Sequence, residues 1–281
     1  MIFVHDKGRL CNNILQYAHL YAWGREHNRK TMSMRFAYKY PYFKICKTPY
    51  HNFFCYVVAK YAAKLKLIPV VHFDDENAST TEQEQIMLNK RYVVATGWYA
   101  RWYDLFLKYK SEILKLFAFL PEVEEKVKAI LSPHSSLLSP LKLGLHIRRG
   151  DYKTWQNGQF YFTDEEYVRV IKSFINNLPS IHPQPSRLVH IFICGNDPTL
   201  NKEYYRKELS SLPVSLTFPD GNPGEDLCLL SHCDYLIGPP STFTLVASMY
   251  HDAPLCWLSD TSRPITAASF RKFDYLFKNI V

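Results

Sequence analysis

One stretch near the middle of the chain constrains the fold most, because it joins an apolar segment to a cluster of charges. Residues 143–147 (Leu-Gly-Leu-His-Ile) are apolar and alternating, which predicts a buried strand. Arg148, Arg149, Gly150 and Asp151 follow directly. A guanidinium group can bind two phosphate oxygens at once, and Gly150 is expected to let the chain turn tightly there. The stretch predicts either an anion site at a sheet edge or an ordinary strand end with a surface salt bridge.

The second half of the chain alternates strand and helix patterns, which predicts a parallel sheet. The expected strands are 142–147, 188–194, 214–218, 234–237 and 254–257, and the expected helices are 163–177, 199–209, 224–232 and 241–250. A capping box, Thr163 to Glu166, is expected to open the first of these helices. The Ser- and Pro-rich residues 132–140 are the best candidate for a linker. We therefore expect an α/β fold of two Rossmann-type lobes, residues 1–135 and 136–281, with a cleft between them.

The first lobe is expected to open with a strand, a glycine-containing loop and a helix. Residues 2–4 are apolar, residues 5–13 form the predicted loop, and apolar residues recur at helical spacing from Ile14 to Trp23. Asn13 could cap this helix. Further strands are expected at 69–73 and 92–99, and helices over 101–131, with Pro121 starting a new one.

Composition limits the partners. The formal net charge is +8, with 34 Lys and Arg against 26 Asp and Glu. No block of basic residues or basic–aromatic stripe occurs, so a nucleotide sugar or an anionic membrane surface fits better than nucleic acid. Residues 57–67 read as a helix with lysines outside its apolar positions. A helix lying on a membrane surface is one interpretation, and the solvated face of an ordinary helix is the favoured one.

The cysteines and the apolar runs indicate the compartment. Seven cysteines are scattered without a CxxC pair, which favours buried thiols over a metal knuckle or a redox motif. The apolar run at the N-terminus is too short for a signal peptide, and no run approaches the length of a membrane span. The sequence therefore predicts a soluble protein of the cytoplasm. Asp74 and Asp75 lack a third ligand, so no metal site is expected.

Two loops in the second lobe carry polar residues after a predicted strand. Asp197 follows the strand at 188–194 and could contact a ligand or form an Asx turn. Ser241, Thr242 and Phe243 begin the last predicted helix, where two hydroxyls and free backbone N–H groups suit a phosphate. Plain capping by Ser241 would give the same pattern.

Three segments resemble one enzyme family. Residues 146–152 resemble the HxRRxDY motif of the α-1,2-fucosyltransferases of glycosyltransferase family 11. Residues 8–13 are similar to that family's G-x-L-G-N-Q segment and to the G-R-F-G-N of protein O-fucosyltransferases, with Cys11 in place of the second glycine. Residues 224–243 are similar to its D-L-x-L-M-S-x-C and N-S-T-F segment, with Pro240 in place of asparagine. Cys11 lacks the freedom of glycine at positive φ, so the loop shape is left open.

The resemblance implies a GT-B architecture and an inverting transfer of L-fucose from GDP-fucose to the 2-hydroxyl of a terminal galactose. The candidate catalytic residues, taken from the resemblance and from the motif, are Arg149, Asn12 and Asp151. The candidate donor-binding residues are Arg9, His146, Arg148, Asp197, Ser241, Thr242 and Phe243. The candidate acceptor wall is Trp98 and Tyr99, which could equally be aromatic residues of the core.

No DxD tripeptide occurs, so arginines, helix termini and hydroxyls are expected to replace a metal ion. His146 is expected to orient the loop rather than act as a base, and the sequence names no base. The net charge would suit a lipid-linked acceptor and peripheral membrane contact. Alternatives are a transferase for another GDP-sugar and a non-catalytic glycan- or nucleotide-binding protein of the same fold.

Overall fold

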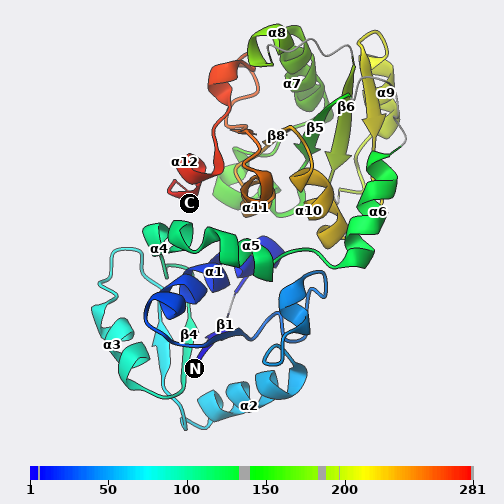
Figure 1. The fold of residues 1–281 in the computed structure, drawn as a ribbon. Helices are drawn as coiled ribbons and strands as arrows, with labels where there is room; N and C mark the ends of the chain where they lie inside the picture. Colours follow the sequence, from blue (N-terminus) through cyan, green and yellow to red (C-terminus); the bar gives the residue numbers. More distant parts are fainter. Residues whose placement is uncertain (6, 133–139, 183–187, 196, 280–281) are drawn as a thin grey trace. The chain divides into compact units, whose positions relative to one another are not determined.

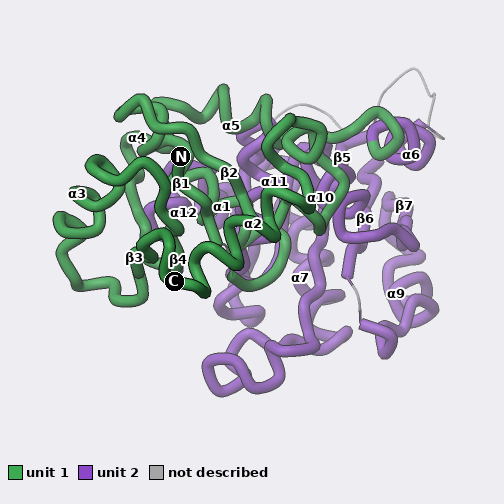
Figure 2. The backbone as a smooth tube through the Cα atoms, turned by 90° about the horizontal axis from the view of Figure 1, so that it is seen from below, with its two compact units in different colours: residues 1–123 green, residues 124–281 purple. Residues whose placement is uncertain are grey.

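The computed structural model describes residues 1–5, 7–132, 140–182, 188–195 and 197–279. Its residues divide into two compact units, 1–123 and 124–281, which Figure 2 colours separately. The predicted lobe boundary, between residues 135 and 136, and most of the predicted linker lie outside the described residues. Within the described part, no helix is both long and apolar enough to cross a bilayer.

The first unit contains a parallel sheet of four strands in the order β2-β1-β4-β3. These strands are β1 (Ile2–His5), β2 (Thr31–Ser33), β3 (Val70–His72) and β4 (Val93–Thr96). Its helices are α1 (Leu10–Glu26), α2 (Phe53–Lys64), α3 (Thr81–Asn89), α4 (Tyr103–Lys108) and α5 (Lys110–Leu116), with a 3₁₀ turn, η1 (Lys44–Lys47). α1 is buried over most of its length, because it packs against α4, α5 and the sheet.

The second unit contains a parallel sheet of five strands in the order β7-β6-β5-β8-β9. The strands are β5 (Leu141–His146), β6 (Val189–Cys194), β7 (Val214–Thr217), β8 (Tyr235–Gly238) and β9 (Leu255–Trp257). Both sheets are parallel throughout. The prediction of an α/β fold with two parallel sheets is confirmed.

Helices cover both faces of the second sheet (Figure 1). α7 (Asp164–Asn176) and α9 (Lys202–Leu209) pack against Leu143, Leu145 and Ile191 on one face. α10 (Pro223–Ser231) lies against the other face, where Leu230 approaches Gly144. The remaining elements are α6 (Pro121–Leu131), α8 (Leu178–Ile181), α11 (Thr242–His251), α12 (Phe273–Phe277), η2 (Gly150–Lys153), η3 (Trp155–Gly158) and η4 (Ala267–Ser269).

Two local predictions about helix starts can be compared with the structure. The capping box is confirmed: Thr163 caps α7, and Glu166 bonds back to the Thr163 backbone. The prediction that Asn13 caps the first helix is wrong, because α1 already starts at Leu10 and Asn13 lies inside it. Cys11 lies in the first turn of α1, where a helical backbone needs no glycine. The positive φ in this segment belongs to Gly8, at 93°.

Close packing at the carboxyl edge of the second sheet depends on Gly195 and Gly238 and not on Gly150, the glycine expected from the sequence. A Cβ on Gly150 would meet no atom within 4 Å, and its φ is not positive, so the expected need for glycine there is wrong. A Cβ on Gly195 would lie 2.5 Å from the carbonyl oxygen of Ile147, and one on Gly238 would lie 3.0 Å from that of His146. These two glycines let the loops after β6 and β8 approach the end of β5.

Candidate active site

The candidate site of the second unit lies where β5, β6 and β8 end. His146 is the last residue of β5 and is buried, with its ring stacked on Phe243 at 4.8 Å between centroids. Burial, together with the positive charge of Arg148, lowers the pKa of His146 to about 3. The ring is therefore neutral at physiological pH. It fits a positioning role better than that of a general base.

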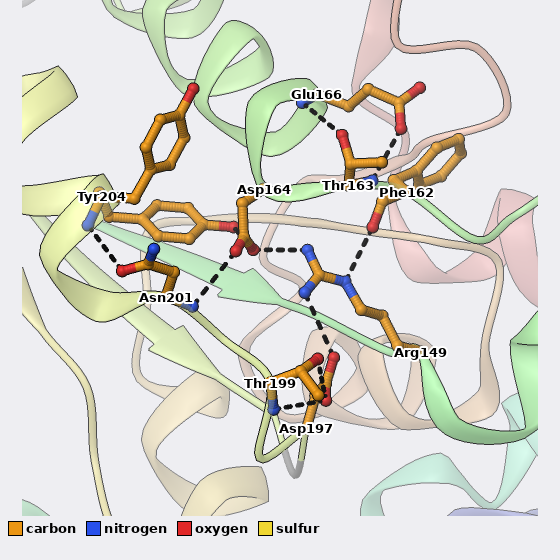
Figure 3. A network of polar contacts seen from close by, with 10 residues as sticks. Arg149, Phe162, Thr163, Asp164, Glu166, Asp197, Thr199, Asn201 and Tyr204 are labelled. Carbon is orange, nitrogen blue, oxygen red and sulfur yellow. Dashed lines mark hydrogen bonds and ion pairs between the residues drawn. The ribbon is translucent and has the colours of Figure 1, made fainter.

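Arg149 lies in the centre of a buried polar network (Figure 3). Its Nη2 donates to Asp164 at 2.5 Å, its Nη1 to Asp197 at 3.2 Å and its Nε to the carbonyl oxygen of Phe162 at 2.9 Å. The side chain is only 6% exposed. The loop after β5, the start of α7 and the loop after β6 are thus joined through one guanidinium group.

The two carboxylates around Arg149 are themselves held in place. Asp197 accepts hydrogen bonds from the backbone N–H and hydroxyl of Thr199, so the predicted Asx-type turn is present. Burial acts to raise the pKa of Asp197, but these hydrogen bonds and Arg149 outweigh it, and the pKa lies below its usual value. Asp164 also accepts from the Tyr205 hydroxyl and the Asn201 backbone. Burial opposes the charge of Arg149, and the two carboxylates nevertheless raise the pKa of its guanidinium.

Arg148 has a different environment from its neighbour. Its Nη2 pairs with Asp151 at 2.9 Å, and its guanidinium lies over the ring of Tyr152 at 4.6 Å. The Nε is buried and has no hydrogen-bond partner. The side chain of Asp151 is 43% exposed and that of Arg148 is 19% exposed, so this pair is partly open to solvent. A ligand oxygen could satisfy the Nε without breaking a buried ion pair.

A hydrogen bond ties this motif to the start of α11. The Tyr152 hydroxyl donates to the carbonyl oxygen of Pro240 at 2.5 Å. The next residue, Ser241, is the N-cap of α11 and accepts from the backbone N–H of Thr244 at 3.4 Å. Thr242 opens the helix. The two predicted phosphate-binding segments, 146–152 and 241–243, are therefore connected within one unit.

Asp226 lies within residues 224–243, the third segment that resembles the family, and the structure gives it a candidate role. It lies in the first turn of α10, and its Oδ1 is buried without a hydrogen-bond partner. Burial, with help from Glu225 and Asp220, raises the pKa of its carboxyl to about 7. A buried carboxyl oxygen without a hydrogen-bond partner indicates a place for N–H donors from a ligand. Its helix-start position was the signal that could have found it.

Arg9 and Asn12 belong to the first unit. Arg9 is exposed at the N-cap of α1, and Asn12 lies in the first turn of that helix. A Cβ on Gly8 would come within 2.7 Å of the Asn12 amide nitrogen, so this glycine is required both by space and by its positive φ. Gln16 holds the preceding loop by bonding both the N–H and the carbonyl of Lys7.

The predicted acceptor residues follow β4 in the same unit. Trp98 and Tyr99 are both partly exposed. The Arg101 guanidinium lies 4.0 Å from the centre of the Trp98 ring, and its Nη2 is buried without a partner. Burial lowers the pKa of Arg101 to about 10. Arg101, which the sequence pattern assigned to a helix, is thus a further polar candidate beside this wall.

Comparisons with known proteins agree with the motifs. No protein family model matches the chain. The mouse (Mus musculus) protein described as galactoside 2-alpha-L-fucosyltransferase Sec1 is 24% identical to it, over 94% of this chain and 68% of the mouse protein. The resemblance to the α-1,2-fucosyltransferases therefore extends over most of the sequence rather than over three motifs.

Solved fucosyltransferase structures share the fold. A mutant of Arabidopsis thaliana FUT1 in complex with GDP superposes with a TM-score of 0.60 at 12% identity, over 96% of this chain and 73% of that one. POFUT1 in complex with GDP-fucose gives 0.53 at 10% identity, over 92% and 96%. The fucosyltransferase NodZ from Bradyrhizobium gives 0.53 at 14% identity, over 94% and 96%. The predicted GT-B-like fold is confirmed.

Proposed function

We propose that the chain is an inverting glycosyltransferase that moves L-fucose from GDP-fucose to the 2-hydroxyl of a terminal galactose on a glycan. Fucosyl transfer from GDP-fucose is supported by the mouse relative and by the fold shared with fucosyltransferases that bind GDP or GDP-fucose. The choice of the galactose 2-hydroxyl as the acceptor group is supported by the mouse relative. The shared fold does not specify the linkage, because one structural neighbour is an α-1,6-fucosyltransferase.

The observation that carries the proposal is the hydrogen bond from Tyr152 to the Pro240 carbonyl. It fixes a loop with two arginines beside the N-terminus of a ten-residue helix. Arginine forks and a helix N-terminus both favour phosphate oxygens. Such an arrangement at the carboxyl edge of a parallel sheet suits a diphosphate.

Within this proposal the two arginines differ in role. Arg148 would bind the diphosphate, because its Nε has no hydrogen-bond partner and its ion pair with Asp151 is partly accessible to solvent. The guanidinium of Arg149 is occupied by two carboxylates and a carbonyl, so it would position the loop that carries Arg148. A catalytic contact of Arg149 itself would require it to leave these partners.

Asp226 would read the guanine base. The Watson–Crick edge of guanine presents two N–H donors side by side, and the buried carboxyl of Asp226 has an oxygen without a partner. Binding would replace an unsatisfied acceptor with charge-assisted hydrogen bonds. The preference for GDP over other nucleotides would follow from this contact.

The transfer itself needs charge stabilisation more than proton chemistry. The galactose 2-oxygen forms a bond to C1 of fucose while the bond from C1 to the β-phosphate oxygen breaks, and GDP leaves with the electron pair. Arg148, Ser241, Thr242 and the N–H groups of α11 would stabilise the charge that develops on the β-phosphate. The acceptor proton passes to solvent or to a base that we do not assign. No metal ion is part of this proposal.

The test is transfer from GDP-fucose to a panel of β-galactosides in EDTA, with the wild type, Arg148→Ala and the exposed-arginine control Arg169→Ala. We expect α-1,2-linked product from the wild type and the control, and a loss of at least a hundredfold in kcat/KM for Arg148→Ala. Thermal melts of all three proteins check that folding is retained.

Three results would count against the proposal. Tight GDP binding with transfer of a different GDP-sugar would support another transferase of this fold. Tight GDP binding without transfer or donor hydrolysis, across the whole donor and acceptor panel, would support a binding protein. Activity that disappears in EDTA and returns with a divalent cation would contradict transfer without a metal.

A further inference from the structure

The net positive charge of the chain comes from one region. Between residues 27 and 73 there is no Asp or Glu, while nine residues are Lys or Arg. The other 25 basic residues (34 minus 9) are balanced by the 26 acidic ones. The whole excess of charge therefore belongs to this 27–73 segment of the first unit.

The same segment exposes most of the apolar surface of the chain. Among the described residues, nine of the thirteen large apolar side chains that are exposed lie between Tyr38 and Val70. The largest exposed fractions are 75% for Phe54, 74% for Leu67, 66% for Leu65 and 62% for Phe53. Apolar side chains scattered singly need no explanation, but a concentration of them marks an interaction site.

α2 has two apolar faces, and one of them is left uncovered. Ala59 is buried, and Tyr56 and Ala63 pack with it against Met34 and Val94. At 100° per residue, Phe54, Val58, Tyr61 and Leu65 fall on the opposite side, and all four are exposed. We call these four residues the outer stripe. Lys60, Lys64 and Lys66 lie beside or just after it, and all three are exposed.

We propose that the outer stripe and its lysines dock the protein on a membrane surface that contains anionic lipid. Apolar side chains that enter the headgroup boundary beside a cluster of lysines are the combination by which amphipathic helices bind such surfaces. A nucleic acid would use the lysines but would leave the outer stripe uncovered. The stripe therefore favours the bilayer over a dissolved polyanion.

The experiment measures co-sedimentation of the whole chain with vesicles of phosphatidylcholine alone and with 30% phosphatidylglycerol (a composition chosen on the order of natural anionic membranes). We expect binding to the anionic vesicles only. Lys60→Gln/Lys64→Gln/Lys66→Gln should weaken binding to the anionic vesicles at least tenfold, since each lysine near the surface contributes about fivefold. Phe54→Ser/Leu65→Ser should also weaken this binding at least tenfold, because two apolar side chains no longer enter the headgroup boundary.

Matched controls change the same charge and the same number of exposed apolar side chains elsewhere. Lys115→Gln/Lys207→Gln/Lys272→Gln removes three exposed lysines outside the segment, and Leu88→Ser/Tyr275→Ser removes two exposed apolar side chains. Both should bind like the wild type. Circular dichroism and GDP affinity check that every variant is folded.

Three outcomes would overturn the proposal. The wild type could fail to sediment with anionic vesicles at moderate salt. The lysine control could weaken binding as much as the lysine variant, which would mean that net charge alone acts. Binding could depend on the lysines and be insensitive to Phe54→Ser/Leu65→Ser, which would indicate a polyanion site instead.

A second, independent inference concerns α10 and α6. Cys228 and His232 are four residues apart at the end of α10, so they lie on one side of the helix. Their ligand atoms and a carboxylate oxygen of Glu124, on α6, all lie within 4.8 Å of one another. The His232 Nδ1 bonds to the carbonyl oxygen of Cys228 at 2.9 Å, which leaves Nε2 facing Glu124 at 3.8 Å. A backbone contact of this kind fixes the ring of a metal-binding histidine.

The geometry points to a zinc site that joins α6 to α10. Thiolate, imidazole and carboxylate are the ligands that Zn²⁺ binds, and tetrahedral bond lengths place their donor atoms roughly 3.3–3.7 Å apart. The donor atoms would approach each other by at most about 1.5 Å, and the Cys228 thiol would release its proton to solvent on binding. His232 and Glu124 are about 30% exposed, which leaves an entry path and room for a water as fourth ligand.

The test titrates the chelator-treated protein with Co²⁺ and Zn²⁺. We expect a cobalt–thiolate absorption band, displacement of Co²⁺ by Zn²⁺ and a rise in Tm with Zn²⁺, all lost in Cys228→Ser and His232→Gln. Cys233→Ser removes a nearby buried thiol and should keep all three. No thiolate band, or an equal loss of the band in Cys233→Ser, would overturn the assignment. Chelator would lower Tm without stopping fucosyl transfer, which separates this site from the proposed reaction.

Discussion

The loops that follow β1 and β5 occupy equivalent places, each after an interior strand of a parallel sheet, but they are held by different chemistry. In the first unit, Gln16 and Asn13 hold the loop by neutral hydrogen bonds to backbone groups, and Arg9 stays exposed. In the second unit the loop is held by Arg149, buried between two carboxylates. An arginine in a motif is therefore not by itself a ligand contact. Whether such an arginine contacts a ligand depends on its burial and on its partners.

The largest expected effect comes from breaking the charged loop. Arg149→Ala leaves Asp164 and Asp197 buried without their cation, which we expect to lower the free energy of unfolding by about 3–5 kcal/mol. Urea denaturation measures it, with Arg169→Ala, an exposed arginine on α7, as the control. A variant as stable as the wild type that no longer binds GDP would instead make Arg149 a ligand contact.

The next effect tests the buried carboxyl of Asp226. Its pKa is raised to about 7 in the folded protein, above the value of about 3.8 in an unfolded chain. Between these values the folded state keeps a proton that the unfolded state has lost, so this group lowers stability as pH rises from about 4 to 7. Asp226→Asn should remove that decline and make the GDP-free protein about 2–4 kcal/mol more stable at pH 8.

Thermal melts from pH 4 to 8 with and without GDP check this prediction, with exposed Glu165→Gln as the control. The same variant should bind GDP more weakly, since an amide replaces an acceptor for the guanine N–H groups. An unchanged pH profile would mean that Asp226 is ionised in the free protein. An unchanged GDP affinity would remove the carboxyl from the donor site.

A smaller effect on the fold, but a clear one on binding, is expected at Arg148. Its pair with Asp151 is open to solvent, so Arg148→Ala should change stability by less than about 1 kcal/mol. Loss of a charge-assisted phosphate contact should weaken GDP binding by about 2–3 kcal/mol. Isothermal titration with GDP measures it, and Arg148→Lys should restore part of the affinity. Equal GDP binding by the alanine variant would refute the division of roles between the two arginines.

The smallest effect is expected for Asp151→Asn. A partly exposed carboxylate three residues from its arginine contributes about 0–1 kcal/mol to stability. Urea titration should therefore find the variant nearly as stable as the wild type. A fall in kcat with unchanged GDP affinity would support the predicted catalytic role of Asp151. A loss of stability above 2 kcal/mol would show that the pair is part of the fold.

Much of the fold was predictable, because the signals were local. Strand and helix periods located β5 to β9 and the main helices of the second unit to within a few residues, and the capping box of Thr163 fixed the start of α7. β2, α8 and α12 were missed because they are short, and α3 was missed because its apolar pattern is weak. Asn13 was misplaced because an asparagine that bonds to its own helix resembles one that caps it.

The sequence named several members of the candidate site, but not their partners or their roles. The motifs named both arginines, yet only the folded chain brings Asp164 and Asp197 to one of them across 15 and 48 residues. Long-range partners leave no periodic signal in a sequence. The same holds for Gly195 and Gly238. A side chain at either position is excluded only because the end of β5 lies against it in the folded chain.

The bond from Tyr152 to the Pro240 carbonyl has a thermodynamic consequence for the donor. Because this bond and the Arg149 network order the loops after β5, β6 and β8 during folding, a nucleotide would meet a surface with little conformational entropy left to lose. Binding of GDP to the second unit should then show a small change in heat capacity, set by the area of the nucleotide and not by the folding of loops around it.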